Sequence, residues 1–279
     1  MSAPIVLKFG GELLEDPGRL ATVVAAIAAV TRRGVPLVVV HGGGKEIDAA
    51  LRAAGIEKRQ VDGLRITDRP TLEVVIGVLA GTINTRFVAA LNAAGVGAVG
   101  LTGADARCGL SEPAPPHRTV DGQTVDLEQV GIPSPHADVR VLSVLAANGF
   151  VPVVACLGAD ANGRLYNVNA DTFAGHLAAR LHARRLIIAG TTAGVLDEGG
   201  ATLPVLDVAA IERLIAARTA TAGMIAKLRA CEDALANGAD DVVIVDGRDA
   251  AALEAAVLGT DAASGFSRTV VRRETQWQR

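Results

Sequence analysis

Two glycine runs, each placed directly after a short apolar stretch, are the segments of this chain best suited to chemistry. One is Lys8-Phe9-Gly10-Gly11, and the other is His41-Gly42-Gly43-Gly44. A strand that ends in glycine and turns into a helix points bare backbone N–H groups at one place, so such a turn can bind an anionic, phosphate-like group. Two such turns predict that two anionic groups are held close together.

Two lysines occupy positions where a cation is unfavourable unless it serves a site. Lys8 lies inside an otherwise apolar strand, where an unpaired charge is costly to bury. The alternative is an edge strand with a solvated lysine. Lys227, in the segment 221–227, lies just inside the start of a helix, where the helix dipole disfavours a cation. Both positions favour a role in binding an anion.

The run after His41 fits neither common nucleotide-binding motif. Ile47 takes the third glycine position of the dinucleotide template, and Gly44-Lys45-Glu46 lacks both the hydroxyl residue and the upstream glycine of the Walker pattern. A plain strand-to-helix turn is the alternative. We expect His41 to be a satisfied core or turn histidine rather than a catalytic base.

Arg65 stands in a loop, residues 63–68, just before a long helical pattern. Arginine is the side chain best suited to a bidentate grip on a carboxylate. The alternative is an exposed ion pair with Asp62 or Asp68. Thr67 or Asp68 is also a candidate cap for the following helix.

The segment Asn167-Val168-Asn169-Ala170-Asp171 opens another helix. Asn and Asp are good helix caps, so capping and a functional role are both open. Alternation along an extended segment places Asn167, Asn169 and Asp171 on one side.

Strand-length apolar runs alternate with helical patterns along the chain, which predicts an α/β fold with a mostly parallel sheet covered on both faces. The stretch 107–137 is rich in proline, contains the turn Asp121-Gly122, and is interpreted as loops and a hairpin that could act as a lid. We place a lobe boundary near Ala183. Strands are expected at 5–9, 37–40, 98–101, 151–155, 185–189 and 241–245, and helices at 19–31, 45–54, 71–93, 139–148, 170–182, 208–217, 224–236 and 250–258.

Composition excludes several classes of protein. The 279 residues carry a formal net charge of −3 and only 3% aromatic residues, which argues against nucleic acid as a partner. Cys108, Cys156 and Cys231 are odd in number and widely spaced, which is typical of a reducing compartment. We expect no signal peptide and no uncharged apolar run long enough to span a bilayer. A cytoplasmic protein without a membrane partner is therefore predicted.

Taken together, the motifs resemble the amino-acid kinase family. They occur in the family's order from residue 5 to the last expected strand. The matching pieces are Lys8–Gly11, Val39–Gly44, Gly63–Asp68, Ala80–Asn84, Gly100–Asp105, Val125–Leu127, Asn167–Asp171 and Gly223–Lys227.

The resemblance implies an αβα sandwich around an open, mostly parallel sheet, with two lobes. Residues 1–182 would bind an acyl amino acid and residues 183–279 would bind ATP. The Arg65 loop and the Asn167–Asp171 segment resemble one branch of the family most closely, and this resemblance implies transfer of the ATP γ-phosphoryl group to the γ-carboxylate of N-acetyl-L-glutamate, in arginine biosynthesis. ATP and Mg²⁺, the latter held mainly by the nucleotide phosphates, are the implied cofactors. No metal-ligating residue is assigned.

The resemblance also implies roles for individual residues. Lys8 and Lys227 would stabilise the transferring phosphoryl group, and Asp171 would lie between them and fix their positions. The substrate would be bound by Gly43, Gly44, Arg65 and Asn167, with Arg65 on its α-carboxylate. The nucleotide would be bound by Lys8, Gly11, Thr191 and Lys227.

Two departures from the family pattern bear on these expectations. Gly190-Thr191-Thr192 stands where the family usually has an Asp, which affects nucleotide contacts. The chain also starts at its first strand, without the N-terminal helix of arginine-inhibited hexameric relatives, so a homodimer without arginine feedback is expected. The alternatives are a kinase for N-succinylglutamate, carrier-bound aminoadipate, aspartate or carbamate, and a nucleotide- or amino-acid-binding regulator without turnover.

Overall fold

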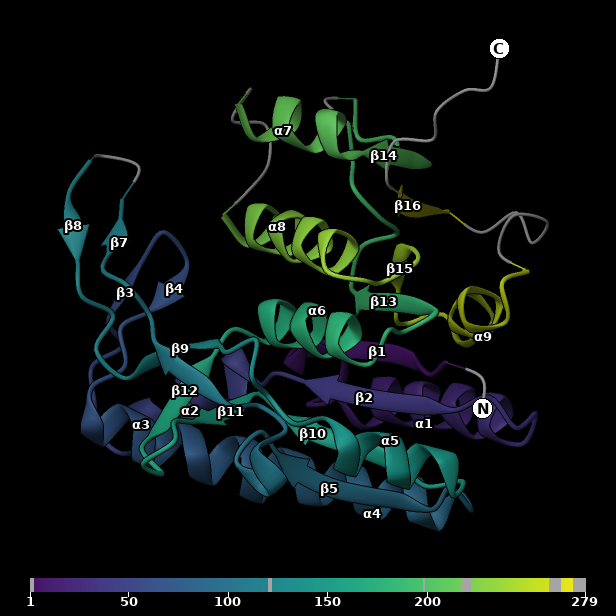
Figure 1. Cartoon of the computed structure of the whole chain (residues 1–279), viewed down its shortest axis with the longest axis horizontal. Helices are drawn as coiled ribbons and strands as arrows, with labels where there is room; N and C mark the ends of the chain where they lie inside the picture. The colour runs from purple at the N-terminus through teal and green to yellow at the C-terminus, as the bar shows by residue number, and fades with distance from the viewer. Residues whose placement is uncertain (1–2, 120–121, 198, 217–221, 261–266, 273–279) are drawn as a thin grey trace.

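A central sheet organises the molecule (Figure 1). The computed structural model describes residues 3–119, 122–197, 199–216, 222–260 and 267–272. Within these residues the sheet has eight strands in the order β14-β16-β15-β13-β1-β2-β10-β5. Their bounds are β1 (Ile5–Phe9), β2 (Leu37–His41), β5 (Ala98–Thr102), β10 (Val151–Ala155), β13 (Arg185–Gly190), β14 (Val205–Asp207), β15 (Val242–Asp246) and β16 (Arg268–Arg272).

The sheet is mostly parallel, as predicted. Its neighbouring strands run parallel except β15 and β16, which are antiparallel. The strands that form its centre are runs of Val, Ile and Leu, and β1, β2 and β10 are buried along their whole length. Continuous apolar runs are typical of parallel strands covered on both faces. Because β1 lies between β13 and β2, Lys8 is not on an edge strand.

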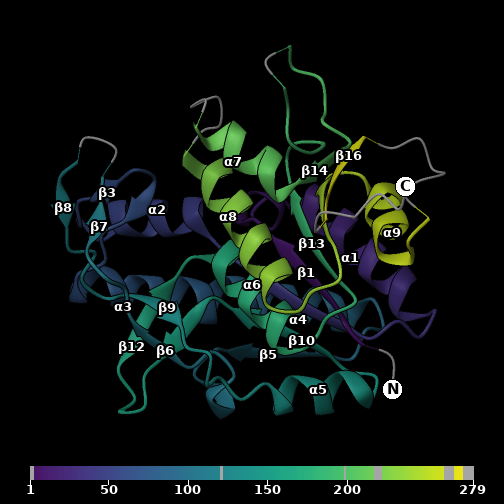
Figure 2. The same ribbon diagram turned by 45° about the horizontal axis from the view of Figure 1, so that its top comes forward.

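Helices cover the two faces of the sheet (Figure 2). On one face α1 packs against α4 and α9, and on the other α6 packs against α8 and β1. The helices are α1 (Pro17–Thr31), α2 (Gly44–Ala53), α3 (Arg69–Ile76), α4 (Thr85–Ala93), α5 (Arg140–Ala147), α6 (Ala170–Arg180), α7 (Val208–Ala216), α8 (Ala222–Ala236) and α9 (Ala250–Leu258), with short 3₁₀ turns η1 (Gly11–Leu13) and η3 (Asp105–Arg107).

The long helix expected at 71–93 is present but not uniform. Asp68 caps its start, since the Asp68 side chain accepts from the backbone N–H of Thr71 at 2.9 Å. Between α3 and α4 the backbone forms a π-helical segment, η2 (Gly77–Asn84). By length and composition the whole stretch 69–93 could cross a membrane. Its apolar side chains, including Leu79 and Phe87, instead pack into the core of the sheet domain.

A second, smaller sheet and two hairpins stand beside the main sheet. The small sheet has the order β11-β12-β9-β6 within the described residues. In the stretch 107–137 the expected hairpin is present as β7–β8, although Asp121 of its turn lies outside the described residues. The bounds are β3 (Gln60–Val61), β4 (Leu64–Arg65), β6 (Ser111–Pro113), β7 (His117–Arg118), β8 (Thr124–Val125), β9 (Val130–Pro133), β11 (Leu157–Ala159) and β12 (Leu165–Val168).

The interpretation of the rest of 107–137 as loops is wrong for β6 and β9. Strand β9 pairs with β12 in parallel and with β6 in antiparallel fashion, so these two segments belong to a sheet, whereas the other described residues outside the hairpin form turns and loops. The prolines and the short apolar runs of this stretch give little strand signal, and the partner strand β12 is distant in sequence. Strand β14, three residues long at the edge of the main sheet, and strand β16, which lies between β14 and β15, were also missed.

The strands of the main sheet fall into two groups according to their position in the sequence. The strands β1, β2, β10 and β5 all precede residue 182, and β13, β15, β16 and β14 all follow residue 183. The two groups meet where β1 pairs with β13, and Ile5 lies opposite Arg185 there. One continuous sheet therefore joins both segments of the chain.

Candidate active site

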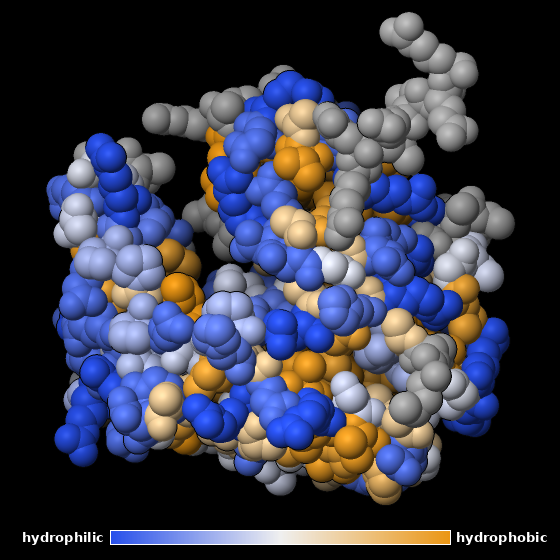
Figure 3. Space-filling view, viewed as in Figure 1, coloured by the Kyte–Doolittle hydropathy of each residue, from blue (hydrophilic) through white to orange (hydrophobic). Residues whose placement is uncertain are grey.

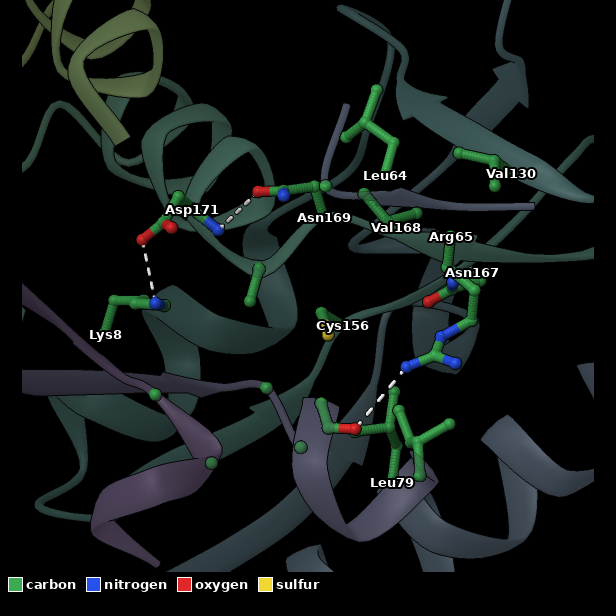
Figure 4. Close-up of a pocket in the computed structure, with 18 of the residues that line it drawn as sticks. Lys8, Leu64, Arg65, Leu79, Val130, Cys156, Asn167, Val168, Asn169 and Asp171 are labelled. Atoms are coloured by element: carbon green, nitrogen blue, oxygen red, sulfur yellow. Dashed lines mark hydrogen bonds and ion pairs between the residues drawn. The ribbon is translucent and has the colours of Figure 1, made fainter. Parts of the chain in front are cut away.

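The carboxyl ends of β1, β2 and β10 meet the starts of α2 and α6 and the β3–β4 hairpin around one cavity. Its volume is about 270 Å³, and its walls come from segments far apart in sequence (Figure 4). In the space-filling view the surface is also hollowed between the β3–β4 and β7–β8 hairpins and helices α7 and α8 (Figure 3). The cavity is lined by Lys8, Gly10, Gly11, Glu12, Gly42, Gly43, Gly44, Ile47, Gly63, Leu64, Arg65, Leu79, Val130, Cys156, Asn167, Val168, Asn169, Ala170 and Asp171.

The two glycine turns touch each other at this cavity. A Cβ atom on Gly11 would lie 2.7 Å from the Cα of Gly43, and a Cβ on Gly43 would collide with the side chain of Ile83 in η2. Side chains are therefore excluded from both positions by close backbone and core contacts. The contact brings the turn after β1 and the turn after β2 together, as the sequence predicted.

Lys8 forms a buried ion pair with Asp171. The Lys8 Nζ atom lies 2.8 Å from Asp171 Oδ1, and the exposed fractions of the two side chains are 8% and 12%. Asn169 caps α6 by accepting from the backbone N–H groups of Asp171 and Thr172, which fixes Asp171 in the first turn. Burial lowers the pKa of Lys8, but the charges of Asp171 and Glu12 outweigh it and leave the pKa raised.

Lys227 approaches the same region from α8 without reaching the cavity wall. A Cβ built on Gly190, at the end of β13, would lie 3.5 Å from Lys227 Nζ and 3.9 Å from Glu12 Oε1. Burial and the positive charge of Lys8 lower the pKa of Lys227, while the charges of Asp171 and Glu12 oppose this. Lys227 thus interacts with Lys8 and Asp171 through charge, and it is not among the residues that line the cavity.

Arg65 sits opposite Lys8 across the cavity. Its Nη2 atom donates to Asp48 Oδ1 at 2.5 Å and lies 3.4 Å from the carbonyl oxygen of Gly44. The sequence-based alternative, an ion pair of Arg65 with Asp62 or Asp68, is wrong. Asp62 pairs with His117 and Asp68 pairs with Arg59.

Asn167 joins this side of the cavity. Its Nδ2 atom donates to Thr67 Oγ1 at 3.1 Å, which links β12 to the loop that carries Arg65.

His41 is fully buried beneath the glycine turn. Its Nδ1 contacts the carbonyl oxygen of Gly42 at 3.2 Å, and Asn84 Nδ2 lies 3.0 Å from its Nε2. Burial lowers the pKa of His41 to about 4, so the ring is neutral at pH 7 with a proton on Nδ1. The expectation of a satisfied turn histidine is confirmed.

Three residues around the cavity were missed from sequence. Glu12 follows the first glycine turn and Cys156 follows β10, so both stand at the carboxyl ends of strands, a placement that could have identified them. Burial raises the pKa of the Cys156 thiol to about 12, so it is neutral.

Asp48 on α2 could not be identified from the sequence, because its partner Arg65 is distant in sequence. Thr191 follows β13 directly but is not among the lining residues.

The cavity wall combines the ammonium group of Lys8 and the guanidinium group of Arg65 with the backbone of the two glycine turns. Among the described residues that line it there is no histidine, so this part of the wall offers no imidazole base. Such an arrangement is suited to holding anions and neutralising charge that develops on them.

Comparison with known proteins decides the family. Residues 3–246 match the amino acid kinase family. The chain belongs to this family. It is 41% identical over 251 residues to the acetylglutamate kinase of Acidiphilium cryptum, covering 88% of this chain and 83% of that protein. The acetylglutamate kinase of Brucella abortus is 40% identical over 250 residues, with coverage of 88% and 83%.

Several solved structures share the fold. A Streptococcus mutans protein, smu.665, has a TM-score of 0.77 at 28% identity, covering 88% of this chain and 96% of that one. The N-acetylglutamate synthase of Neisseria gonorrhoeae has a TM-score of 0.81 at 24% identity. The match covers 98% of this chain but only 60% of the synthase chain. Carbamate kinase from Giardia lamblia has a TM-score of 0.67 at 16% identity, covering 98% and 99%.

Proposed function

We propose that this chain transfers the γ-phosphoryl group of ATP to the γ-carboxylate of N-acetyl-L-glutamate. A carboxylate oxygen attacks the γ-phosphorus, the bond from that phosphorus to the bridging oxygen breaks, and ADP leaves with the electron pair. The product is an acyl phosphate, N-acetylglutamyl 5-phosphate. The observation that carries the proposal is one cavity with Lys8, two glycine turns and Arg65, in a chain about 40% identical to acetylglutamate kinases.

The reaction needs no general base. The attacking carboxylate has an ordinary pKa of about 4.3 and is already ionised at pH 7. The main barrier that the protein can lower is the repulsion between this carboxylate and the triphosphate. Lys8 and Lys227 would reduce that repulsion, and Asp171 holds Lys8 in place at 2.8 Å. The backbone turns at Gly11 and Gly43 would add N–H donors.

The two groups of strands suggest a division of binding. In our proposal residues 1–182 hold the acyl amino acid, with Gly43, Gly44 and Asn167 around it and Arg65 on its α-carboxylate. Residues 183–279 hold the nucleotide, with Thr191 and Lys227 contributing from this segment. Lys8 and Gly11, at the junction of the two groups of strands, would contact the phosphates. The pairing of β1 with β13 supports this arrangement by placing Lys8 beside the second segment.

Mg²⁺ is part of the proposal as a companion of ATP. The described residues form no cluster of three or more His, Cys, Asp or Glu side chains suited to a metal. Asp171 at the cavity is already paired with Lys8. These residues fit a Mg²⁺ ion that is held mainly by the nucleotide phosphates and enters with ATP. There it would supply further positive charge.

We also propose a cytoplasmic homodimer without arginine feedback. The three cysteines are buried, free thiols, which agrees with a reducing compartment. Light scattering behind size exclusion should give twice the chain mass, and millimolar L-arginine should leave turnover unchanged. A stable monomer would contradict the first part and arginine inhibition the second.

The function is tested by coupled ADP release with a panel of acceptors. We expect turnover with N-acetyl-L-glutamate and much weaker turnover with N-succinyl-L-glutamate, L-aspartate and carbamate. Preferred turnover of another acceptor would assign the chain to a different kinase. ATP binding without ADP release from any acceptor would indicate a regulator.

A further inference from the structure

Asp48 connects the glycine-turn helix to both arms of the β3–β4 hairpin. It lies on α2, four residues after Gly44. Its Oδ1 accepts from Arg65 Nη2 at 2.5 Å, and its Oδ2 accepts from Lys58 Nζ at 2.8 Å. Lys58 precedes β3 and Arg65 is in β4, so one carboxylate receives a cation from each arm.

The two cations differ in how they use this carboxylate. The Lys58 side chain is 40% exposed, whereas the Arg65 side chain is 13% exposed and lines the cavity. Burial raises the pKa of Asp48, but the hydrogen bonds from Lys58 and Arg65 outweigh this and leave the pKa lowered. Asp48 is therefore ionised at neutral pH and able to hold a guanidinium by a charge-assisted hydrogen bond.

The other terminal nitrogen of Arg65, Nη1, is buried and has no hydrogen-bond partner among the described residues. A buried guanidinium N–H without a partner is costly and points to a missing acceptor. Asp48 and Gly44 contact the same guanidinium through Nη2, so they restrict its rotation without using Nη1.

We propose that Asp48 is a positioning residue that holds Arg65 through Nη2, so that Nη1 meets the α-carboxylate of the acyl amino acid. This inference rests on the proposed function, because it uses the substrate assigned to Arg65. Asp48 itself does not touch the substrate. It acts by keeping one rotamer of Arg65 before the substrate binds, which reduces the ordering that binding requires.

The test compares two acceptors that differ in one group. N-Acetyl-L-glutamate carries the α-carboxylate, and 4-acetamidobutanoate lacks it while keeping the reacting carboxylate and the acetamide. Asp48→Asn preserves the size of the side chain but removes its charge. We expect the variant to raise the KM and Kd of N-acetyl-L-glutamate about tenfold, as for loss of one charge-assisted contact. The kcat and the KM of ATP should stay within twofold, and binding of 4-acetamidobutanoate should not change.

Two matched variants separate positioning from a general effect on the hairpin. Lys58→Met removes the other partner of Asp48 and should leave both acceptors unaffected. Glu15→Gln breaks the exposed pair between Glu15 and Lys45, and Lys45 lies on α2 together with Asp48. This variant should also have no effect on either acceptor. If Asp48→Asn does not fold, Asp48→Glu displaces the carboxylate by one methylene, and the same selective loss is expected.

The outcomes distinguish the inference from the proposed function. Equal losses for the two acceptors, a loss with Lys58→Met of the same size, or an unchanged KM in Asp48→Asn would overturn the role of Asp48. Absence of turnover by the wild-type protein with N-acetyl-L-glutamate would instead overturn the proposed function. In that case, calorimetric Kd values for the same acceptors still decide whether Asp48 acts through Arg65.

Discussion

At the scale of single residues, the site depends on charges placed where burial alone would disfavour them. Lys8 lies in the middle of a parallel sheet and remains charged because Asp171 is 2.8 Å away. Removing one partner of such a buried pair leaves an uncompensated charge, which is more harmful than losing the pair as a whole. The pair therefore keeps each charge offset by the other and holds a cation at the cavity.

Replacing Lys8 leaves Asp171 buried without its partner and should destabilise the protein, and in the variant that still folds the chemical step should be slowed. Lys8→Met keeps the volume but removes the charge that we propose to act on the transferring phosphoryl group. We expect kcat to fall about a hundredfold to a thousandfold, as for loss of a preorganised donor. Steady-state kinetics on folded protein checks this, with Lys45→Met as control, since Lys45 is exposed and paired with Glu15. A kcat within threefold of wild type would contradict the proposed role.

At the scale of elements, the contact between two glycine turns sets the geometry of the cavity. The turn at Gly11 rests on the backbone of Gly43, and Gly43 rests on Ile83 in the π-helical segment. The sequence predicted both turns from strand, glycine and helix order. It did not predict the π-helical segment or its contact with Gly43, because the largely apolar pattern of 71–93 is read as one continuous helix.

Adding one methyl group between the turns should separate them. In Gly11→Ala the new Cβ would lie 2.7 Å from Gly43 Cα, so the backbone must shift. We expect kcat/KM to fall at least tenfold, because small displacements of aligned groups are costly in catalysis.

Gly77→Ala provides the control for this substitution. Gly77 has open space around its Cβ position, so activity should be unchanged. Equal activity of Gly11→Ala and Gly77→Ala would argue against a strict requirement for the contact between the turns.

At the scale of the whole molecule, the sequence predicted what depends on local pattern. The strands around Lys8 and His41 follow from continuous apolar runs, and the meeting of their carboxyl ends follows from a parallel sheet. Pairings such as β9 with β12, and side-chain contacts such as Arg65 with Asp48, join residues distant in sequence. Local pattern carries no information about such pairs. The position of Lys227 beside Gly190 likewise could be known only from the folded structure.

Stability of the whole fold should depend on pH through His41. Its native pKa is lowered to about 4, whereas the unfolded value is about 6.5. Between these values the unfolded chain binds a proton that the native protein does not, so stability falls as pH falls. The loss from His41 between pH 7 and pH 4 should be about 3 kcal/mol.

Urea unfolding at the two pH values measures this effect. His41→Gln keeps one donor and one acceptor but does not titrate, so its loss of stability on acidification should be smaller by that amount. His136→Gln, at an exposed position, should behave like wild type. Equal pH dependence of His41→Gln and wild type would contradict the assignment of His41 as a buried neutral ring.

The central claim is that one cavity brings an acyl amino acid and ATP together to form an acyl phosphate. Hydroxylamine trapping measures that product directly. With N-acetyl-L-glutamate, Mg²⁺ and ATP, we predict one acyl hydroxamate for each ADP released, and a fall of both rates by about a hundredfold or more in Lys8→Met. Release of ADP without hydroxamate, or no reaction at all with folded wild-type protein, would contradict the account.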